Sequence, residues 1–199
     1  MNRAQDTGHR TAVRGGVFLV SLGFALLVTE IGFRVLAHSR NLRAYAEAEN
    51  EQLPAPGTVV SLGDIVRPIA DDRIVYELRA GLKDVKFEGA MLRTNQLGFR
   101  GSEIEEEKHN DTIRIVGIGD SVMFGWGVEE PQTFLALLEQ KLNEQFPERS
   151  WEVINTAVPG YNTVIEVATL ATKALQLEPD LVLIGFVGND LDLPNFLSS

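Results

Sequence analysis

The second half of the chain alternates short apolar runs with segments of helical pattern, and no other feature limits the possible folds as strongly. Three runs are rich in β-branched residues and predict strands: TIRIVGIG (112–119), WEVIN (151–155) and DLVLIGF (180–186). The third run is apolar enough to predict a strand that is buried on both faces. Strands that alternate with helices in this order predict an α/β fold with a parallel sheet.

The segments between the predicted strands carry the signals of helices. In the first segment, an apolar residue at every fourth position predicts one face of an amphipathic helix: Phe134, Leu138, Leu142 and Phe146. In the second segment, Thr163 and Glu166 have the spacing of a capping box, which predicts the first turn of a helix. Glu178-Pro179 ends this helix, because the residue before a proline disfavours helical backbone.

The composition excludes several classes of protein. The 199 residues include no cysteine, so a disulfide scaffold and a thiolate metal site are excluded. The net charge of −10 argues against nucleic acid as a partner, because a phosphate backbone needs a basic surface. Asp190 and Asp192 lack a supporting His or Cys, and Gly117-x-Gly119 lacks the third glycine of a nucleotide-binding loop. We therefore expect neither a metal nor another cofactor.

An apolar stretch near the N-terminus predicts a membrane segment. The stretch Gly15–Phe33 contains one charged side chain, Glu30, and is about as long as the roughly 20 residues that a spanning helix needs. Glu30 and Arg34 have the i,i+4 spacing of a helical ion pair. Three arginines before the stretch favour a cytoplasmic N-terminus and an extracytoplasmic remainder: Arg3, Arg10 and Arg14. A signal peptide cleaved near Ala37, which would give a secreted protein, and a buried core helix are the alternatives.

The remaining segments predict the domain organisation. We assign residues 1–37 to a cytoplasmic tail and transmembrane anchor. Residues 38–57 are rich in helix formers, end in Pro54-Ala55-Pro56-Gly57, and are expected to form a stalk. Residues 58–110 are expected to form an auxiliary, strand-rich lead-in, and residues 111–199 to hold the α/β domain.

Each predicted strand is followed by a short turn with polar residues. The three turns are Gly119-Asp120-Ser121, Val158-Pro159-Gly160-Tyr161-Asn162 and Gly188-Asn189-Asp190. The carboxyl ends of parallel strands lie at one edge of a sheet, where ligands bind in open α/β folds. A Ser hydroxyl, a Gly backbone N–H and an Asn amide that converge there can serve as a nucleophile and as oxyanion donors. This combination predicts acyl transfer.

These segments resemble a known family. The stretches IVGIGDSVMFGWGV (115–128), INTAVPGYNT (154–163) and LVLIGFVGNDL (181–191) are similar to three conserved blocks of the SGNH hydrolases, or GDSL-type esterases, although Val122 replaces the usual Leu. RTNQLGFRG (93–101) is similar to the lead-in of many bacterial members, and we expect its Arg93 and Arg100 to form structural salt bridges. The resemblance, over residues 73–195, implies a three-layer, flavodoxin-like parallel sheet that is C-terminally incomplete here.

The resemblance also implies roles for single residues. Ser121 matches the catalytic nucleophile, and its own N–H, the Gly160 N–H and the Asn189 side chain match the oxyanion hole. Without a Cβ, Gly160 is expected to let the substrate approach closely. Asp120 is expected to brace the turn. The family's general base is a His in an Asp-x-x-His block, yet His9, His38 and His109 all precede Ser121. We therefore expect this chain to be the N-terminal portion of a longer protein and to be inactive alone.

The resulting expectation is a membrane-anchored, extracytoplasmic ester hydrolase without a cofactor. Its expected partner is a small acyl ester or an acetylated glycan, O-acetylated envelope glycans being one candidate, and the membrane is reached through the N-terminal helix. A polysaccharide O-acyltransferase of the same fold is the first alternative, because a sugar hydroxyl can replace water in resolving the acyl-enzyme. A catalytically inert fragment or binding module is the second.

Overall fold

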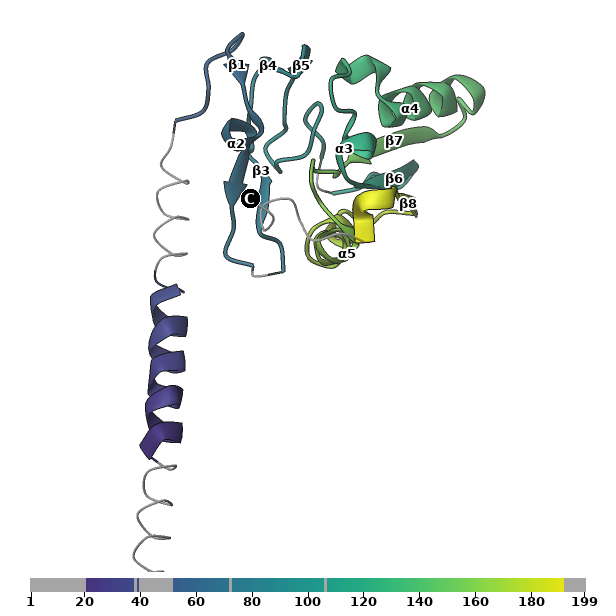
Figure 1. Ribbon diagram of the computed structural model, residues 1–199. Coiled ribbons are helices and arrows are strands. Elements are labelled where there is room, and N and C mark those ends of the chain that lie inside the picture. Colours follow the sequence, from purple (N-terminus) through teal and green to yellow (C-terminus); the bar gives the residue numbers. More distant parts are fainter. Residues whose placement is uncertain (1–20, 38, 40–51, 72, 106, 192–199) are drawn as a thin grey trace, which may run out of the picture. The chain divides into compact units, whose positions relative to one another are not determined.

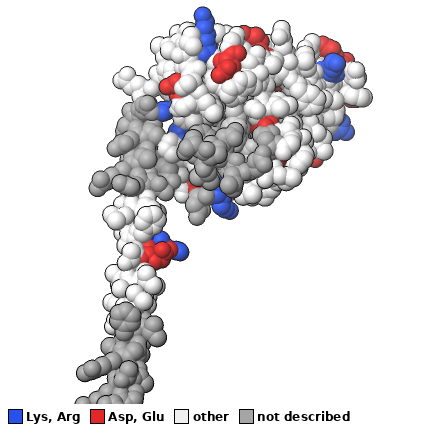
Figure 2. All heavy atoms as spheres, viewed as in Figure 1, with Lys and Arg blue, Asp and Glu red and all other residues white. Residues whose placement is uncertain are grey.

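The chain divides into two compact units, Met1–Ala46 and Glu47–Ser199. The computed structural model describes the following residues: 21–37, 39, 52–71, 73–105 and 107–191. In the first unit, residues 21–37 form a helix with exposed apolar side chains. Its two charged side chains form the predicted pair, with 2.7 Å between Arg34 Nε and Glu30 Oε1, and stand out on an otherwise uncharged surface (Figure 2).

The prediction of a transmembrane helix over Gly15–Phe33 is not supported. Residues 15–20 lie outside the described residues, as does most of the predicted stalk. In the part of the chain that the structure describes, no helix is both long and apolar enough to cross a membrane.

The second unit begins with short strands that form two small sheets. The elements are β1 (Val59–Val60), α2 (Leu62–Ile65), β2 (Val66–Pro68), β3 (Tyr76–Leu78), β4 (Val85–Phe87) and β5 (Ala90–Leu92). β4 and β5 form an antiparallel hairpin with β1 added parallel to β4, and β2 pairs antiparallel with β3. These strands belong to the segment expected to be a strand-rich lead-in, which we call the lead-in (residues 58–110).

The rest of the unit follows the predicted order of strands and helices. The elements are β6 (Thr112–Gly119), α3 (Ser121–Phe124), η1 (Glu130–Gln132), α4 (Phe134–Gln145), β7 (Ser150–Asn155), α5 (Thr163–Thr172), η2 (Ala174–Leu177), β8 (Leu181–Gly185) and η3 (Gly188–Leu191). The strands form a sheet of order β7-β6-β8, and β6 pairs parallel with both neighbours. The predicted α/β fold with a parallel sheet is therefore confirmed.

One face of this sheet packs against α3 and α4. A Cβ on Gly117 would collide with Leu135 of α4, and a Cβ on Gly119 would lie 2.7 Å from Met123 Cβ of α3. Both glycines belong to β6, so they serve close packing of helix on strand rather than a phosphate-binding loop.

The opposite face of the sheet packs against the segment that follows β7. Val116 and Ile118 alternate with the two glycines along β6 and are buried with Ala174 and Leu177 of η2. Figure 1 shows α4 and α5 on opposite sides of the sheet. Two right-handed crossover connections place their helices on opposite faces when the chain reverses direction across the sheet. Here the chain moves from β6 to β7 and then back across β6 to β8.

The predicted apolar stripe of α4 is only partly correct. Phe134 is 58% exposed and Phe146 is 43% exposed, whereas the fully buried residue of this helix is Leu135. Positions four apart advance by about 400° around a helix, so a stripe drawn through four such positions drifts off the buried face. Leu135 together with the half-buried Leu138 and Leu142 follows the sheet more closely.

The prediction that the third strand is buried on both faces is wrong. Leu181 and Ile184 of β8 are 50% and 64% exposed. Within the described residues β8 pairs with β6 alone and is an edge strand, so it lacks the neighbours that would cover it.

The lead-in and the α/β elements share one hydrophobic core. Phe87 of β4 packs edge-on against Phe124 and Trp126, with ring centroids 6.2 and 4.8 Å away. The same buried cluster contains Tyr76 from β3 and Tyr161 from the loop after β7. The lead-in is therefore placed directly against the segments that carry the predicted site.

Candidate active site

Ser121 lies at the first position of α3, immediately after β6. The carboxylate of Asp120 is buried and accepts a hydrogen bond from the Val122 N–H at 2.9 Å, which caps this short helix. Asp120 thus braces the turn, as expected. Ser121 Oγ lies 3.4 Å from Asp120 Oδ2, at the outer limit of a hydrogen bond. The N–H of a first helical residue has no acceptor within its own helix, so the Ser121 N–H is free for an external one.

The other end of α3 is held by Arg100 of the lead-in. This buried guanidinium donates to the carbonyls of Phe124 (2.8 Å), Gly125 (2.7 Å) and Val128. The predicted salt bridge of Arg100 is wrong, since backbone carbonyls at a helix C-terminus satisfy its charge. Arg93 does form the predicted bridge, 2.7 Å from Asp84 Oδ1.

The turn after β7 is fastened to the turn that carries Ser121. The Thr156 N–H donates to the Gly117 carbonyl at 2.9 Å, and the Val158 N–H donates to the Gly119 carbonyl at 3.2 Å. Gly119 precedes Ser121 by two residues, and Gly160 follows Val158 by two. The parallel strands therefore place these two turns at one edge of the sheet, as predicted.

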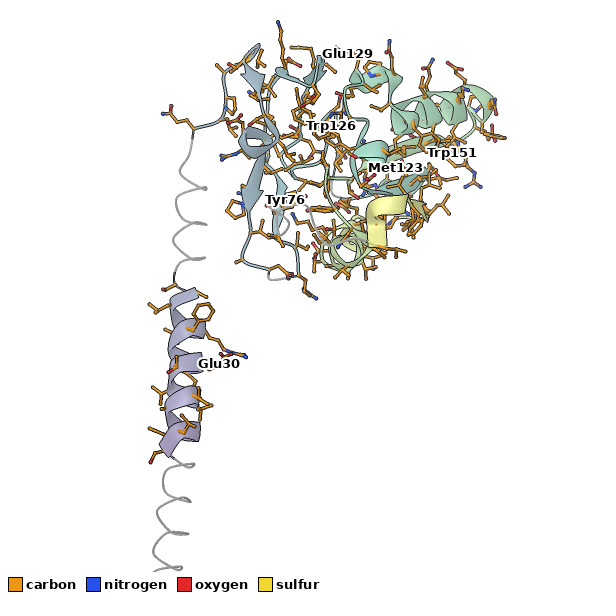
Figure 3. All side chains as sticks on the ribbon, viewed as in Figure 1. Glu30, Tyr76, Met123, Trp126, Glu129 and Trp151 are labelled. Atoms are coloured by element: carbon orange, nitrogen blue, oxygen red, sulfur yellow. The ribbon has the colours of Figure 1, made fainter. Side chains whose placement is uncertain are left out.

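Gly160 is required by its backbone conformation and by a close neighbour. Its φ is +81°, in the left-handed region, and a Cβ would lie 2.7 Å from Tyr76 Oη. A side chain at position 160 would thus collide with Tyr76 of the lead-in, which is labelled in Figure 3. The Gly160 N–H donates no hydrogen bond to the residues that the structure describes, so it stays available for an oxyanion.

The third turn follows β8 at the same edge. Gly185 pairs in register with Gly119, and η3 begins three residues later. The backbone of Asn189 belongs to η3, but its side chain lies outside what the structure describes. The next residue, Asp190, is buried, and its Oδ2 accepts from the Val187 N–H at 2.6 Å.

A buried glutamate near these turns was missed by the sequence analysis. Glu166 lies in the first turn of α5 and is 3% exposed. Burial, followed by the charges of Asp190 and Asp120, raises the pKa of Glu166 to about 7. Glu166 Oε1 and Asp190 Oδ1 are buried and have no hydrogen-bond partner among the described residues. The spacing from Thr163 predicts a capping role for Glu166, and no local pattern marks it as buried.

His109 cannot reach Ser121. It is exposed and pairs with Glu105, with 2.8 Å between His109 Nε2 and Glu105 Oε2. His109 precedes the amino end of β6, whereas Ser121 follows the carboxyl end of this eight-residue strand, about 25 Å away at roughly 3.3 Å per residue. His9 and His38 lie outside the described residues. In the ranges that the structure covers, no group of three acidic or histidine side chains could hold a metal ion.

Known proteins resemble this chain at the level of a family and of solved structures. Residues 118–199 match the model of the GDSL-like lipase/acylhydrolase family. Among solved structures, the crystal structure of TesA is similar over 39% of this chain, with 27% sequence identity and a TM-score of 0.36. The matched region is 42% of the TesA chain, so this chain spans less than half of that protein's length. None of the curated proteins compared with the chain matches it.

Proposed function

Because residues 118–199 belong to the GDSL-like lipase/acylhydrolase family, we propose that the chain is part of an SGNH-type serine ester hydrolase with Ser121 as its nucleophile. The observation that carries the proposal is the connection of the three turns at the carboxyl edge of the sheet. Val158 binds the Gly119 carbonyl, and Gly185 pairs with Gly119, so the turns of Gly160 and Asn189 both adjoin the Ser121 turn.

In this mechanism, Ser121 Oγ attacks the acyl carbonyl of an ester, and the ester C–O bond breaks, which releases the alcohol and leaves an acyl-enzyme. Water then attacks the acyl-enzyme, which releases the acid and restores the Ser121 hydroxyl. The negative charge that develops on the carbonyl oxygen is stabilised by the N–H groups of Ser121 and Gly160 and by the Asn189 amide. Each such donor lowers the barrier by about 3 kcal/mol.

A base must accept the proton of the Ser121 hydroxyl when its oxygen attacks the ester. Among the described residues, no histidine lies within reach of Ser121. We assign this role to a His of an Asp-x-x-His block, as the resemblance to the family implies. The test compares this chain with a form of the protein extended through such a block, using short p-nitrophenyl esters. The extended form should hydrolyse them, Ser121→Ala should abolish the activity, and exchange of the exposed Ser102 for Ala should not.

The 199-residue chain itself is expected to show no turnover, because loss of the base from a serine triad costs about a millionfold in rate in the best-studied case. Ser121-dependent hydrolysis by this chain would contradict the assignment of the base. It would indicate a base within the chain, with Glu166 and Asp190 as the buried carboxylates to exchange first.

The substrate and the acceptor of the acyl group distinguish a hydrolase from a transferase. We propose an acyl ester such as an O-acetylated envelope glycan as substrate, with hydrolysis as the reaction. Free acetate released from an acetylated glycan supports a hydrolase. Acetyl transfer to an added unacetylated glycan, without free acetate, would favour the O-acyltransferase of the same fold instead.

We further propose that the N-terminal region anchors the protein with its N-terminus in the cytoplasm and the remainder outside. The basic residues before the apolar stretch and the exposed apolar side chains of residues 21–37 support this topology. Alkaline phosphatase fused after Ser199 should be active, and β-galactosidase at the same junction should be inactive. The opposite result would contradict the topology, and a free fusion protein cut near Ala37 would favour the signal peptide.

A further inference from the structure

The hydroxyl of Tyr76 contacts the peptide unit that carries the Gly160 N–H. Tyr76 Oη donates a hydrogen bond of 2.7 Å to the carbonyl oxygen of Pro159, 83 residues later in the chain. This carbonyl and the Gly160 N–H belong to the same peptide plane. Tyr76 is buried, and burial raises the pKa of its hydroxyl above the ordinary value, so it remains a donor at any physiological pH.

The geometry of the peptide bond connects this contact to the site. A trans peptide is planar, and its C=O and N–H point in opposite directions; the described chain contains no cis peptide. With the Pro159 carbonyl held by Tyr76, the Gly160 N–H must point away from the lead-in. The hydrogen bond on the carbonyl also polarises the peptide and makes its N–H a stronger donor.

Tyr76 is itself fixed in place by its neighbours. Tyr161 Oη donates to the main-chain carbonyl of Tyr76 at 2.5 Å, and the two rings pack edge to face with centroids 5.3 Å apart. The hydroxyl of Tyr76 also fills the space that a Cβ on Gly160 would need. Tyr76 and Tyr161 therefore make different contacts, since only Tyr76 reaches the Pro159–Gly160 peptide through its hydroxyl.

We propose that Tyr76 is a positioning residue for the oxyanion hole, which aims and strengthens the Gly160 N–H through the Pro159 carbonyl. The inference rests on the proposed function of Ser121. It gives the lead-in a part in catalysis, because the strand that carries Tyr76 lies outside the three family blocks.

The first test needs no activity and uses the 199-residue chain. Tyr76→Phe should shift the Pro159 carbonyl ¹³C resonance upfield and move the Gly160 amide resonance, because the hydrogen bond on that carbonyl is lost. Thr94→Val is the control, since Thr94 Oγ1 is another buried hydroxyl of the lead-in and donates to the Arg79 carbonyl at 2.6 Å. A Tyr76→Phe spectrum with both resonances unchanged would overturn the inference.

The second test uses the extended, active form. Tyr76→Phe should lower kcat about tenfold with KM within twofold, because a donor used in the transition state is loosened rather than removed. Thr94→Val, which removes a buried hydroxyl of the lead-in that donates to the Arg79 carbonyl, should lower the melting temperature but leave kcat within twofold. Equal kcat values for Tyr76→Phe and the wild type would overturn the inference on Tyr76 and leave the proposed function of Ser121 intact. If the wild type showed no Ser121-dependent hydrolysis, the proposed function would be overturned, and the resonance test would still decide whether Tyr76 orients the peptide.

Discussion

Three carboxyl groups are buried near the turn that presents Ser121, and their hydrogen bonds differ. Asp120 accepts from the Val122 N–H, and Asp190 accepts from the Val187 N–H. Glu166 has a buried oxygen without a partner among the described residues, and its pKa is raised to about 7. A buried carboxyl without such donors is more stable when protonated, so Glu166 carries a proton in part at neutral pH.

Exchange of Glu166 for Gln should change the pH dependence of stability. The pKa of Glu166 is about 7 in the folded chain against the ordinary value of 4.5 for a glutamate, so the folded state binds more protons between these two pH values. Stability therefore falls as pH rises through this window, by at most about 3 kcal/mol at 1.36 kcal/mol per unit. Glu166→Gln should remove this fall, as measured by urea unfolding at pH 5 and pH 8.

The control for this measurement is Glu148→Gln, because Glu148 is exposed in the turn after α4. Its unfolding free energy should keep the wild-type difference between the two pH values. If Glu166→Gln also kept the wild-type difference in unfolding free energy between pH 5 and pH 8, Glu166 would not be the source of the pH dependence.

A methyl group at Gly160 should interact unfavourably with the Tyr76 hydroxyl. Gly160→Ala adds a Cβ 2.7 Å from Tyr76 Oη at a residue with φ of +81°. The left-handed backbone alone costs about 1–2 kcal/mol, and the contact adds to it. In a Tyr76→Phe background the same exchange should cost about 1 kcal/mol less, a coupling that urea unfolding of the four proteins measures. Additive losses would place the Tyr76 hydroxyl away from Gly160.

At the scale of secondary-structure elements, the ends of two helices decide the geometry of the site. α5 begins with Asn162 as its N-cap, because Asn162 Oδ1 accepts from the Ile165 N–H at 3.1 Å. The predicted capping box at Thr163 and Glu166 is one residue out of register, so Thr163 is the first helical residue. This shift places Glu166 in the interior, where it meets the other buried carboxyls.

Removal of the Asn162 side chain should destabilise the fold, and removal of the Thr163 hydroxyl should not. Asn162→Ala leaves the Ile165 N–H without its acceptor, at a cost of about 1 kcal/mol for an N-cap. Thr163→Ala is the matched control, since Thr163 Oγ1 makes no hydrogen bond within the described residues. Unfolding in urea measures the loss of unfolding free energy in both variants. A larger loss for Thr163→Ala would support the predicted capping box, with Thr163 as the N-cap.

The C-terminal end of α3 depends on Arg100, so exchange of this residue should be costly. Arg100→Lys cannot reach the three carbonyls that the guanidinium holds, and it should lower the free energy of unfolding by about 2–4 kcal/mol. Arg93→Lys in the same motif alters an exposed salt bridge and should cost less than about 1 kcal/mol. Equal losses in the two variants would argue against a special role for Arg100.

At the scale of the whole molecule, the unit Glu47–Ser199 combines a well-packed interior with an exposed edge of its main sheet. The lead-in and the α/β elements share a buried cluster that includes Phe87, Phe124 and Tyr161. In contrast, β8 is an edge strand of the described sheet, with Leu181 and Ile184 exposed. An exposed apolar edge strand is a template for pairing with another chain.

A charge on β8 should therefore reduce self-association of the 199-residue chain. Ile184→Lys should shift the weight-average mass in sedimentation equilibrium toward that of the monomer, because an edge lysine opposes strand pairing. Val164→Lys is the control, since Val164 is exposed to a similar degree but lies on helix α5. If the wild-type chain were monomeric at all concentrations, the exposed edge would not drive association.

The sequence by itself determined the order of strands and helices and the direction of the sheet. Hydrophobic periodicity is a local property, so runs such as 112–119 and 151–155 predict their strands without knowledge of their neighbours. The parallel direction follows from the helical crossovers that connect the strands, and with it the edge that carries Ser121 and Gly160.

Only the tertiary structure decided which polar groups hold the site. The contacts of Tyr76 with Pro159 and of Arg100 with Phe124 join residues 83 and 24 positions apart. Which partner a hydroxyl or guanidinium finds depends on the segments that pack around it, and the sequence around Tyr76 or Arg100 carries no record of them. For the same reason, the raised pKa of Glu166 follows from the tertiary structure and not from the local sequence, because burial removes its carboxyl from water.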